Sequence, residues 1–346
     1  MALLRRDGRP ALGADPGREF GSPVARDRRR DAPPPPRHAF RRRARPRPRP
    51  LPRRTRRRLH PADLGSAPVT DLARIEAAAG RLSGIARRTP MLTSPFLDEI
   101  AGRRVLVKPE CLQHTGSFKF RGAFSAISAL PPETRANGVL AYSSGNHAQG
   151  IARAAALFGV PSVIIMPKDA PALKIANTRA LGAEVVLYDR AGGENREAIG
   201  DALAAKRGLT LIKPFDNADV IAGQGTTGLE IAEQAAVEGV EEADVLVCCG
   251  GGGLTSGIAL ALAGHAPGLR ARPVEPDGFD DTRRSLEAGR ITPHDRPEAG
   301  FCDAILTRQP GALTFPILHR LCGPGLTVTE AQVRDAMRAA FTRLKL

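Results

Sequence analysis

One stretch decides how this chain is interpreted: Gly116-Ser117-Phe118-Lys119-Phe120-Arg121-Gly122-Ala123. It contains one of only 7 lysines in a chain with 44 arginines. The β-branched run 104–108 before it predicts a short strand, and the apolar spacing of 118–130 predicts a helix. Lys119 would then lie in the first turn of a helix that follows a strand, where α/β enzymes often place their chemistry. A deprotonated lysine can form a Schiff base with a carbonyl group, although a single lysine is more often a solvated surface charge.

Strand and helix patterns alternate regularly along the rest of the chain. A capped helix is expected from Thr70 to about Gly84, and a last helix over 330–344 with Thr329 and Gln332 as its capping box. The other expected strands are 138–142, 162–166, 184–188, 209–213, 245–249 and 271–274, and the other expected helices are 146–158, 171–181, 195–207, 219–237 and 254–263. This alternation predicts βαβ units and a mostly parallel sheet covered on both faces.

The net charge of +15 is confined to the first 60 residues, which hold 20 Arg, 5 acidic residues and 11 Pro. The remainder is neutral, with 31 basic and 31 acidic residues. Without an apolar period, residues 1–65 are expected to form a disordered, Arg/Pro-rich extension. Two interpretations stay open: a basic arm that binds nucleic acid or another polyanion, or a non-functional extension from a mis-assigned start. The scarcity of aromatic stacking residues in this stretch favours the second.

Cysteines and hydropathy indicate a cytoplasmic, soluble protein. The five cysteines show neither metal-ligand spacing nor a paired framework, which is typical of reduced thiols. Cys248 and Cys249 are expected to pack in the core as strand residues. The 20 uncharged residues 245–264 imitate a membrane span, but four consecutive glycines favour a strand, a loop and a helix.

Two loops between strands and helices have the composition of anion sites. In Gly250-Gly251-Gly252-Gly253, consecutive N–H groups can turn toward one point beside a helix N-terminus, which suits a phosphate. The loop lacks the ending of a nucleotide P-loop, so a phosphate without a nucleotide is indicated; a merely flexible loop is the alternative. Ser143-Ser144-Gly145-Asn146-His147 suits a substrate carboxylate, with ordinary N-capping as the alternative. A Schiff-base lysine and a phosphate site together indicate pyridoxal phosphate.

These motifs closely resemble those of the threonine/serine dehydratases, a group that includes serine racemase within the tryptophan synthase β-like class of pyridoxal-phosphate enzymes. The resemblance runs from about Ile75 to the C-terminus and also includes Ala222-Gly223-Gln224-Gly225-Thr226 and Glu275-Pro276. It implies two open, mostly parallel twisted sheets flanked by helices. The catalytic domain would span 66–346, with an inner small subdomain over about 115–215. Homo-oligomerisation and a small-molecule amino-acid substrate are further expectations from the resemblance.

The resemblance also implies roles for individual residues. Lys119 would bind the cofactor as a Schiff base and later remove the Cα proton. Phe118 would line the cofactor ring, Asn146 would bind the ring hydroxyl, and Gly250, Gly251, Gly252, Gly253 and Leu254 would hold the phosphate. The carboxylate would be bound by Ser143, Ser144, Gly145, Asn146 and His147. Ser144 lies where racemases keep a second proton donor, but dehydratases share this serine. His147 is interpreted as a polar residue of the helix start, not a metal ligand.

A cation site seen in some members falls on Glu275, Asp281 and the carbonyl of Phe279, and hard oxygen ligands of this kind suit Mg²⁺ or Ca²⁺. A solvated acidic loop that includes Asp277 and Asp280 is the alternative.

The resemblance predicts a lyase that converts L-threonine or L-serine to a 2-oxo acid and ammonia, with serine racemase activity as the alternative. The sequence departs from the family at its end: it stops at Leu346, before a late Ser-Gly-Gly-Asn-like loop whose serine faces the pyridine nitrogen. The domain is therefore expected to be C-terminally truncated and to lack its last elements. A second alternative is an inactive remnant whose basic arm binds polyanions.

Overall fold

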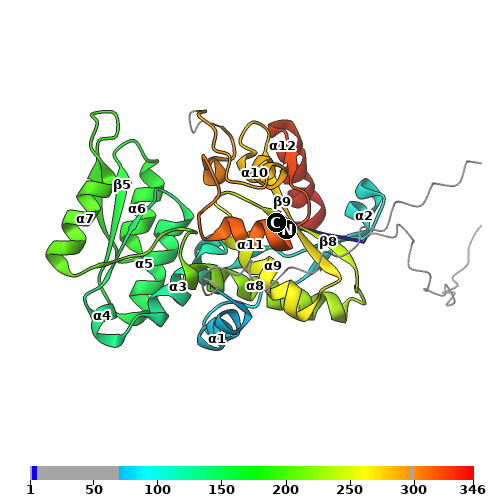
Figure 1. Cartoon of the computed structure of the whole chain (residues 1–346), viewed down its shortest axis with the longest axis horizontal. Helices are drawn as coiled ribbons and strands as arrows, with labels where there is room; N and C mark the ends of the chain where they lie inside the picture. The colour runs from blue at the N-terminus through cyan, green and yellow to red at the C-terminus, as the bar shows by residue number, and fades with distance from the viewer. Residues whose placement is uncertain (1, 6–69, 297–299) are drawn as a thin grey trace, which may run out of the picture. The chain divides into compact units, whose positions relative to one another are not determined.

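A computed structural model describes residues 2–5, 70–296 and 300–346. Their strands form two sheets (Figure 1). The four-stranded sheet has the order β6-β5-β4-β7 and is parallel throughout. Its strands are β4 (Val139–Tyr142), β5 (Ser162–Pro167), β6 (Glu184–Tyr188) and β7 (Thr210–Leu211).

The six-stranded sheet has the order β10-β9-β8-β1-β3-β2. Its parallel half consists of β8 (Ala243–Cys248), β9 (Leu269–Pro276) and β10 (Leu326–Val328). The other half consists of β1 (Ala2–Arg5), β2 (Leu92–Thr93) and β3 (Val105–Val107), with β1 antiparallel to both β8 and β3. The predicted fold class, α/β with two mostly parallel sheets, is confirmed.

Buried apolar side chains form a separate core around each sheet. In the first, α3 (Lys119–Ala129) and α5 (Asn146–Phe158) pack on the four-stranded sheet through Phe120, Ile127 and Ile151. In the second, α8 (Ala218–Val237) and α9 (Gly253–His265) pack on the six-stranded sheet through Ile231 and Ile258. The small-residue face of α8 allows α3 and α8 to approach closely, because a Cβ at Gly223 would lie 2.5 Å from the Arg121 carbonyl oxygen.

The remaining helices lie around these two cores. They are α1 (Leu72–Leu82), α2 (Pro95–Ala101), α4 (Pro132–Ala136), α6 (Ala172–Ala180), α7 (Arg196–Arg207), α10 (Asp281–Ala288), α11 (Thr314–Leu321) and α12 (Glu330–Ala339). There are also short 3₁₀ turns in the described residues: η2 (Glu110–Leu112), η3 (His114–Gly116) and η4 (Asp303–Ile305). A π-helical turn, η5 (Ala340–Leu344), follows α12.

The described elements bear on three predictions made from the sequence. Residues 2–5 belong to the extension expected to be disordered, yet they form β1 in the middle of a sheet, whereas 6–65 lie outside the described residues. The capping box of Thr329 and Gln332 is confirmed, but the helix it starts changes to a π turn at Ala340. The uncharged stretch 245–264 is a strand, a loop and a helix, as expected, and no described helix has the length and apolarity to cross a membrane.

Candidate active site

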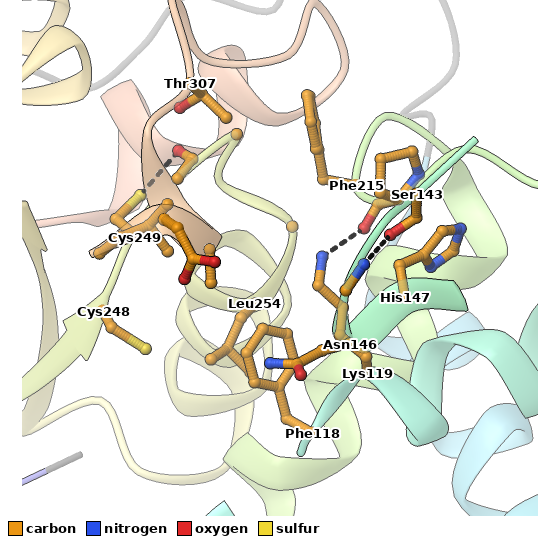
Figure 2. A pocket seen from close by; sticks show the side chains of 18 of the residues that line it. Phe118, Lys119, Ser143, Asn146, His147, Phe215, Cys248, Cys249, Leu254 and Thr307 are labelled. Atoms are coloured by element: carbon orange, nitrogen blue, oxygen red, sulfur yellow. Dashed lines mark hydrogen bonds between the residues drawn. The ribbon is translucent and has the colours of Figure 1, made fainter. Parts of the chain in front are cut away.

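A cavity of about 520 Å³ lies where the carboxyl ends of β4 and β8 face each other. Its lining includes Lys119, the loop 143–147 and the loop 250–253, so three sequence motifs that are far apart in the chain meet in one space. Figure 2 shows Lys119, Ser143 and His147 on one side of the cavity and Cys248 and Cys249 on the other. Brought together in this way, an amine and two glycine- or serine-rich loops can bind one ligand with two anionic groups.

Lys119 begins α3, and its side chain reaches into the cavity. Its Nζ donates a hydrogen bond to the carbonyl oxygen of Pro214 at 2.9 Å and lies 5.4 Å from the centre of the Phe118 ring. Burial lowers the pKa of the amine from 10.5 to about 8, partly opposed by the nearby Cys248 thiol. A lysine with this pKa can react as a nucleophile or accept a proton near neutral pH.

The loop Gly250–Gly253 forms a compact cradle at the start of α9. The residue before the helix, Gly252, has φ +90°, a conformation that favours glycine. A Cβ on Gly251 would lie 2.4 Å from the Phe215 ring, so no side chain fits there. The N–H groups of Gly250, Gly251 and Gly252 meet no acceptor among the described residues. Free N–H groups at a helix N-terminus are what a phosphate requires, so the residues present fit a phosphorylated cofactor. Leu254, the next residue, also lines the cavity.

The loop Ser143–His147 opens α5 without a side-chain cap. Gly145 occupies the capping position, and the Ser143 hydroxyl instead accepts a hydrogen bond from the Gly145 N–H at 3.2 Å. Ser144 and Asn146 both line the cavity. Ordinary N-capping by a serine, the alternative that the sequence left open, is therefore not observed. The N–H groups of the first turn are available to bind a carboxylate.

His147 is a neutral hydrogen-bonding group in the wall of the cavity. Its side chain is 3% exposed, and its Nε2 is 2.9 Å from the carbonyl oxygen of Ile212, so Nε2 carries the proton. Burial, and then the Lys119 charge, lower its pKa to about 3. Its Nδ1 has no partner among the described residues and can accept one hydrogen bond.

Several residues that line the cavity had no role in the sequence-based prediction. Cys248 was expected to be a core residue, but it is exposed to the cavity, and only Cys249 is buried, at 1% exposure. The side chains alternate along β8, and the last residue of a strand opens onto the cavity at its carboxyl end. Pro214 was also given no role, although it directly follows the expected strand 209–213. A position just after the end of a strand in an α/β sheet is a signal that could have identified its carbonyl as a site group. An ion pair between Lys174 and Asp303 (2.9 Å) joins α6 to η4 at the cavity wall.

The predicted cation ligands lie between β9 and α10. Both carboxylates are buried, Glu275 at 1% and Asp281 at 0% exposure. Glu275 accepts hydrogen bonds from the N–H groups of Thr282 and Arg283, each at 2.8 Å. Neither oxygen of Asp281 has a hydrogen-bond partner within the described part of the chain. Burial raises the pKa of Glu275 to about 7 and of Asp281 to about 8.

A buried carboxylate that accepts no hydrogen bond from the described residues fits a cation, but the donor set is small, and the His294 Nε2 lies 4.0 Å from Asp281 Oδ1. No group of three His, Cys, Asp or Glu side chains suited to a metal occurs in 70–296 or 300–346. The site would therefore depend on two carboxylates and the Phe279 carbonyl.

Residues 82–346 match the family described as pyridoxal-phosphate dependent enzymes. An L-threo-3-hydroxyaspartate ammonia-lyase of Pseudomonas sp. is 47% identical over 78% of this chain and 82% of its own length. A serine racemase of Schizosaccharomyces pombe is 39% identical over 79% of this chain and 82% of its own length. The crystal structure of a threonine deaminase from T.th. is 46% identical, covers 80% of this chain and 87% of its own, and superposes with a TM-score of 0.74.

Proposed function

Because the chain belongs to the pyridoxal-phosphate dependent enzymes, we propose that it is an ammonia-lyase acting on a 3-hydroxy amino acid. The products would be a 2-oxo acid and ammonia, with the water lost in the elimination regained in the hydrolysis. The observation that carries this proposal is the shared cavity in which Lys119 lies beside both the Gly250–Gly253 cradle and the Ser143–His147 loop.

Most of the named cavity residues would hold the cofactor, and Lys119 would take part in the reaction. Gly250–Gly253 and Leu254 would hold the cofactor phosphate, Phe118 would contact the ring, and Asn146 would bind the ring hydroxyl. Once bound, pyridoxal phosphate supplies an electron sink for the negative charge that develops at the substrate Cα. Lys119 would bind the cofactor aldehyde and, when displaced by the substrate amine, remove the Cα proton. Its lowered pKa supports this role as a base.

The substrate carboxylate would be held by the free N–H groups at the start of α5, together with Ser143, Ser144 and Gly145. His147 would support this loop as a neutral acceptor through Nδ1, because its Nε2 proton is committed to Ile212. The neutral ring adds no positive charge beside Lys119, which keeps the amine easy to deprotonate.

For the substrate, L-threo-3-hydroxyaspartate is proposed ahead of threonine and serine. The support is that two L-threo-3-hydroxyaspartate ammonia-lyases are 47% and 42% identical to this chain. A threonine ammonia-lyase of Thermotoga maritima is 40% identical, so threonine stays within the proposed class.

The experiment is to incubate the purified full chain with pyridoxal phosphate and each of the three amino acids, and to measure 2-oxo acid and ammonia. Lys119→Ala is the matched control and should reduce the rate of product formation by roughly 10²–10⁴-fold, as expected when a catalytic base is lost. Absence of 2-oxo acid from all three substrates, with cofactor bound, would refute the lyase proposal.

Serine racemase activity is the second candidate, because Ser144 lines the same cavity as Lys119 and could return a proton to Cα. Chiral analysis of serine recovered from the reaction separates the two activities. If racemisation occurs, Ser144→Ala should abolish D-serine formation more strongly than ammonia release.

We also propose that Glu275, Asp281 and the Phe279 carbonyl bind Mg²⁺ or Ca²⁺ as a structural cation. The carboxylate of Asp281 supports this site, because it is fully buried and accepts no hydrogen bond from the described residues. A cation there would fix the end of β9, where Glu275 pairs with β10, to the start of α10.

A further inference from the structure

Arg121 lies two residues after Lys119 in α3, and only 1% of its surface is exposed. Its guanidinium makes a bidentate pair with Glu110, from Nε to Oε2 at 2.7 Å and from Nη2 to Oε1 at 2.9 Å. A second bidentate pair joins it to Glu230, from Nη1 to Oε1 at 2.6 Å and from Nη2 to Oε2 at 3.1 Å. The planar fork of arginine matches a carboxylate in this geometry, and a lysine ammonium cannot reproduce it.

The other groups around Arg121 complete a balanced, buried set of charges. Nη1 also donates to the Thr226 hydroxyl, and Nη2 to the Arg87 carbonyl, both at 3.2 Å. The buried Lys108 ammonium pairs with the same Glu230 carboxylate. Two cations and two carboxylates therefore make up what we call the charge cluster: Lys108, Glu110, Arg121 and Glu230.

The charge cluster and the cavity lie on opposite sides of α3. Successive residues of an α-helix are about 100° apart, so residues two apart point in nearly opposite directions, about 200° around the axis. Lys119 points into the cavity, whereas Arg121 points toward η2 and α8, which carry Glu110 and Glu230. A rotation of α3 about its axis would break both bidentate pairs, so the arginine fixes the direction in which Lys119 points.

The acceptor of the Lys119 amine is tied to the same framework. Pro214, whose carbonyl receives the hydrogen bond from Nζ, lies four residues before α8 begins at Ala218. Helix α8 therefore carries Glu230, the partner of Arg121, and begins shortly after Pro214, the partner of Lys119.

We propose that Arg121 is a positioning residue. Its bidentate hydrogen bonds to Glu110 and Glu230 fix the position of the Lys119 amine relative to the Pro214 carbonyl and the phosphate cradle. The inference rests on the proposed function, for which the amine must meet a cofactor aldehyde. This role differs from general stabilisation of the fold, because it concerns the rotation of α3 about its axis and the position of one reactive atom, Lys119 Nζ.

The test needs a variant that removes the hydrogen bonds from Arg121 to Glu110 and Glu230 without leaving a buried charge unpaired. Arg121→Met alone would leave the largely buried Glu110 carboxylate without a cation, so the informative variant is Arg121→Met with Glu110→Gln, which leaves the Lys108–Glu230 pair in place. Arg121→Lys is the conservative variant, because it keeps the charge and loses the fork. Arg104→Met with Glu238→Gln is the matched control, since it removes a half-buried ion pair outside the charge cluster.

The first readout is the titration of Lys119 in the cofactor-free chain, by competitive labelling with acetic anhydride from pH 6 to 11 and mass spectrometry. The wild-type midpoint should lie near pH 8, with His147 and Cys248 as the titratable neighbours. In the double variant the amine should leave its desolvated position, and the midpoint should rise by at least one pH unit. Arg121→Lys should give an intermediate rise, and the control none.

The second readout compares two ligands by equilibrium binding. Pyridoxal phosphate needs both the cradle and the amine, whereas 4′-deoxypyridoxine 5′-phosphate lacks the aldehyde and needs only the cradle. The double variant should bind pyridoxal phosphate at least tenfold more weakly and the deoxy analogue within twofold of the wild type.

Two results would overturn the positioning role. One is an unchanged Lys119 midpoint and unchanged affinity for pyridoxal phosphate in a folded double variant. The other is an equal loss of both ligands, which would mean that the charge cluster only stabilises the fold. Failure of the proposed lyase would show separately, as absence of 2-oxo acid in the wild type, and the labelling readout would still decide on Arg121.

Discussion

The reactivity of Lys119 comes from where its amine is held, since no carboxylate of the described residues pairs with it. Its hydrogen-bond partner is the neutral Pro214 carbonyl, and the lowered pKa of His147 keeps that neighbour uncharged at neutral pH. Desolvation is therefore the main influence on this lysine, and it favours the neutral, nucleophilic form.

Covalent loading of the cofactor should consequently follow the titration of Lys119. With a pKa of about 8, roughly a tenth of the amine is neutral at pH 7 and about nine tenths at pH 9. Stopped-flow absorbance with pyridoxal phosphate should show an association rate that rises about tenfold over this interval and then levels off. A rate still rising steeply at pH 10.5 would mean that the amine keeps its ordinary pKa. The deoxy analogue is the control and should show no such rise.

Asp281 provides a second prediction for a single residue. Its raised pKa means that the folded state holds the proton more tightly than the unfolded chain, so stability is lost as pH rises from about 4 through about 8. Above pH 8 a cation can take the place of the proton. Ca²⁺ should raise the Tm of the wild type more at pH 8.5 than at pH 6.5, and should not raise that of Asp281→Asn.

The exposed Asp277→Asn is the matched control, because it lies in the same acidic loop, and it should keep the response to Ca²⁺. In the absence of cation, Asp281→Asn should be at least as stable as the wild type at pH 8.5, since it removes a buried charge that accepts no hydrogen bond from the described residues and lies 4.0 Å from the His294 Nε2. An identical Ca²⁺ response in wild type and Asp281→Asn would rule out this carboxylate as a ligand.

At this scale the sequence predicted residue types better than contacts. Lys119 could be singled out because lysines are rare and its neighbours form a motif, and the structure brings it into one cavity with both loops. The Pro214 acceptor was missed because its only sequence signal is its position after an expected strand. The exposure of Cys248 could not be predicted, because strand alternation depends on register.

Among the helices, the starts of α5 and α9 differ from those of α1, α7, α8 and α12. The latter four are capped by the side chains of Asp71, Asn195, Asn217 and Thr329. At the cavity, glycines occupy the capping positions and no side chain caps the helix. Leaving N–H groups free at these two starts sacrifices local stability and creates two anion sites in one space.

A side chain in the Gly250–Gly253 cradle should therefore damage binding and packing together. Gly251→Ala would place its Cβ 2.4 Å from the Phe215 ring, which should lower the free energy of unfolding by about 1–3 kcal/mol. It should also weaken binding of pyridoxal phosphate and of the deoxy analogue alike, by at least tenfold, because both need the phosphate site. Urea unfolding and equilibrium titration measure the two effects.

Gly80→Ala is the control for this substitution. Gly80 lies inside α1 with no atom within 4 Å of an added Cβ, so alanine should stabilise the chain by about 0.5–1 kcal/mol and leave cofactor binding unchanged. Unaltered affinity in Gly251→Ala would show that the phosphate does not bind at this loop.

Elements with strong periodicity were predicted closely, and elements defined by tertiary contacts were not. The bounds of α5 and β6 agree with the expected ranges, since apolar periodicity extends through both and glycines lie beside them, Gly145 and Gly159 at the ends of α5 and Gly182 before β6. The short α2, α11 and β10 were not predicted from the sequence. Segments of three to eight residues carry too few positions for a period, and their structure depends on the neighbours they pack against.

For the molecule as a whole, the six-stranded sheet depends on a pairing between distant parts of the chain. Strand β1 lies between β8 and β3 and is antiparallel to both, with Leu3 opposite Val245 and Leu106. Composition placed residues 2–5 in a basic extension, and no local signal could show that a gap in the sheet would accept them. β8 leads directly into the phosphate cradle, so this pairing supports the strand on which the cradle is built.

Interrupting β1 should therefore lower both stability and cofactor affinity. Leu3→Pro removes one backbone N–H from a central strand, and leaving its acceptor unpaired costs about 1–3 kcal/mol. For a chain of this size we expect a fall in Tm of several degrees (roughly 2–4 °C per kcal/mol) and weaker binding of pyridoxal phosphate, measured by thermal unfolding and absorbance titration. Leu3→Ala keeps the N–H and should retain more of both. Equal Tm values for the proline and alanine variants would mean that β8 and β3 hold the sheet together without the hydrogen bonds of β1.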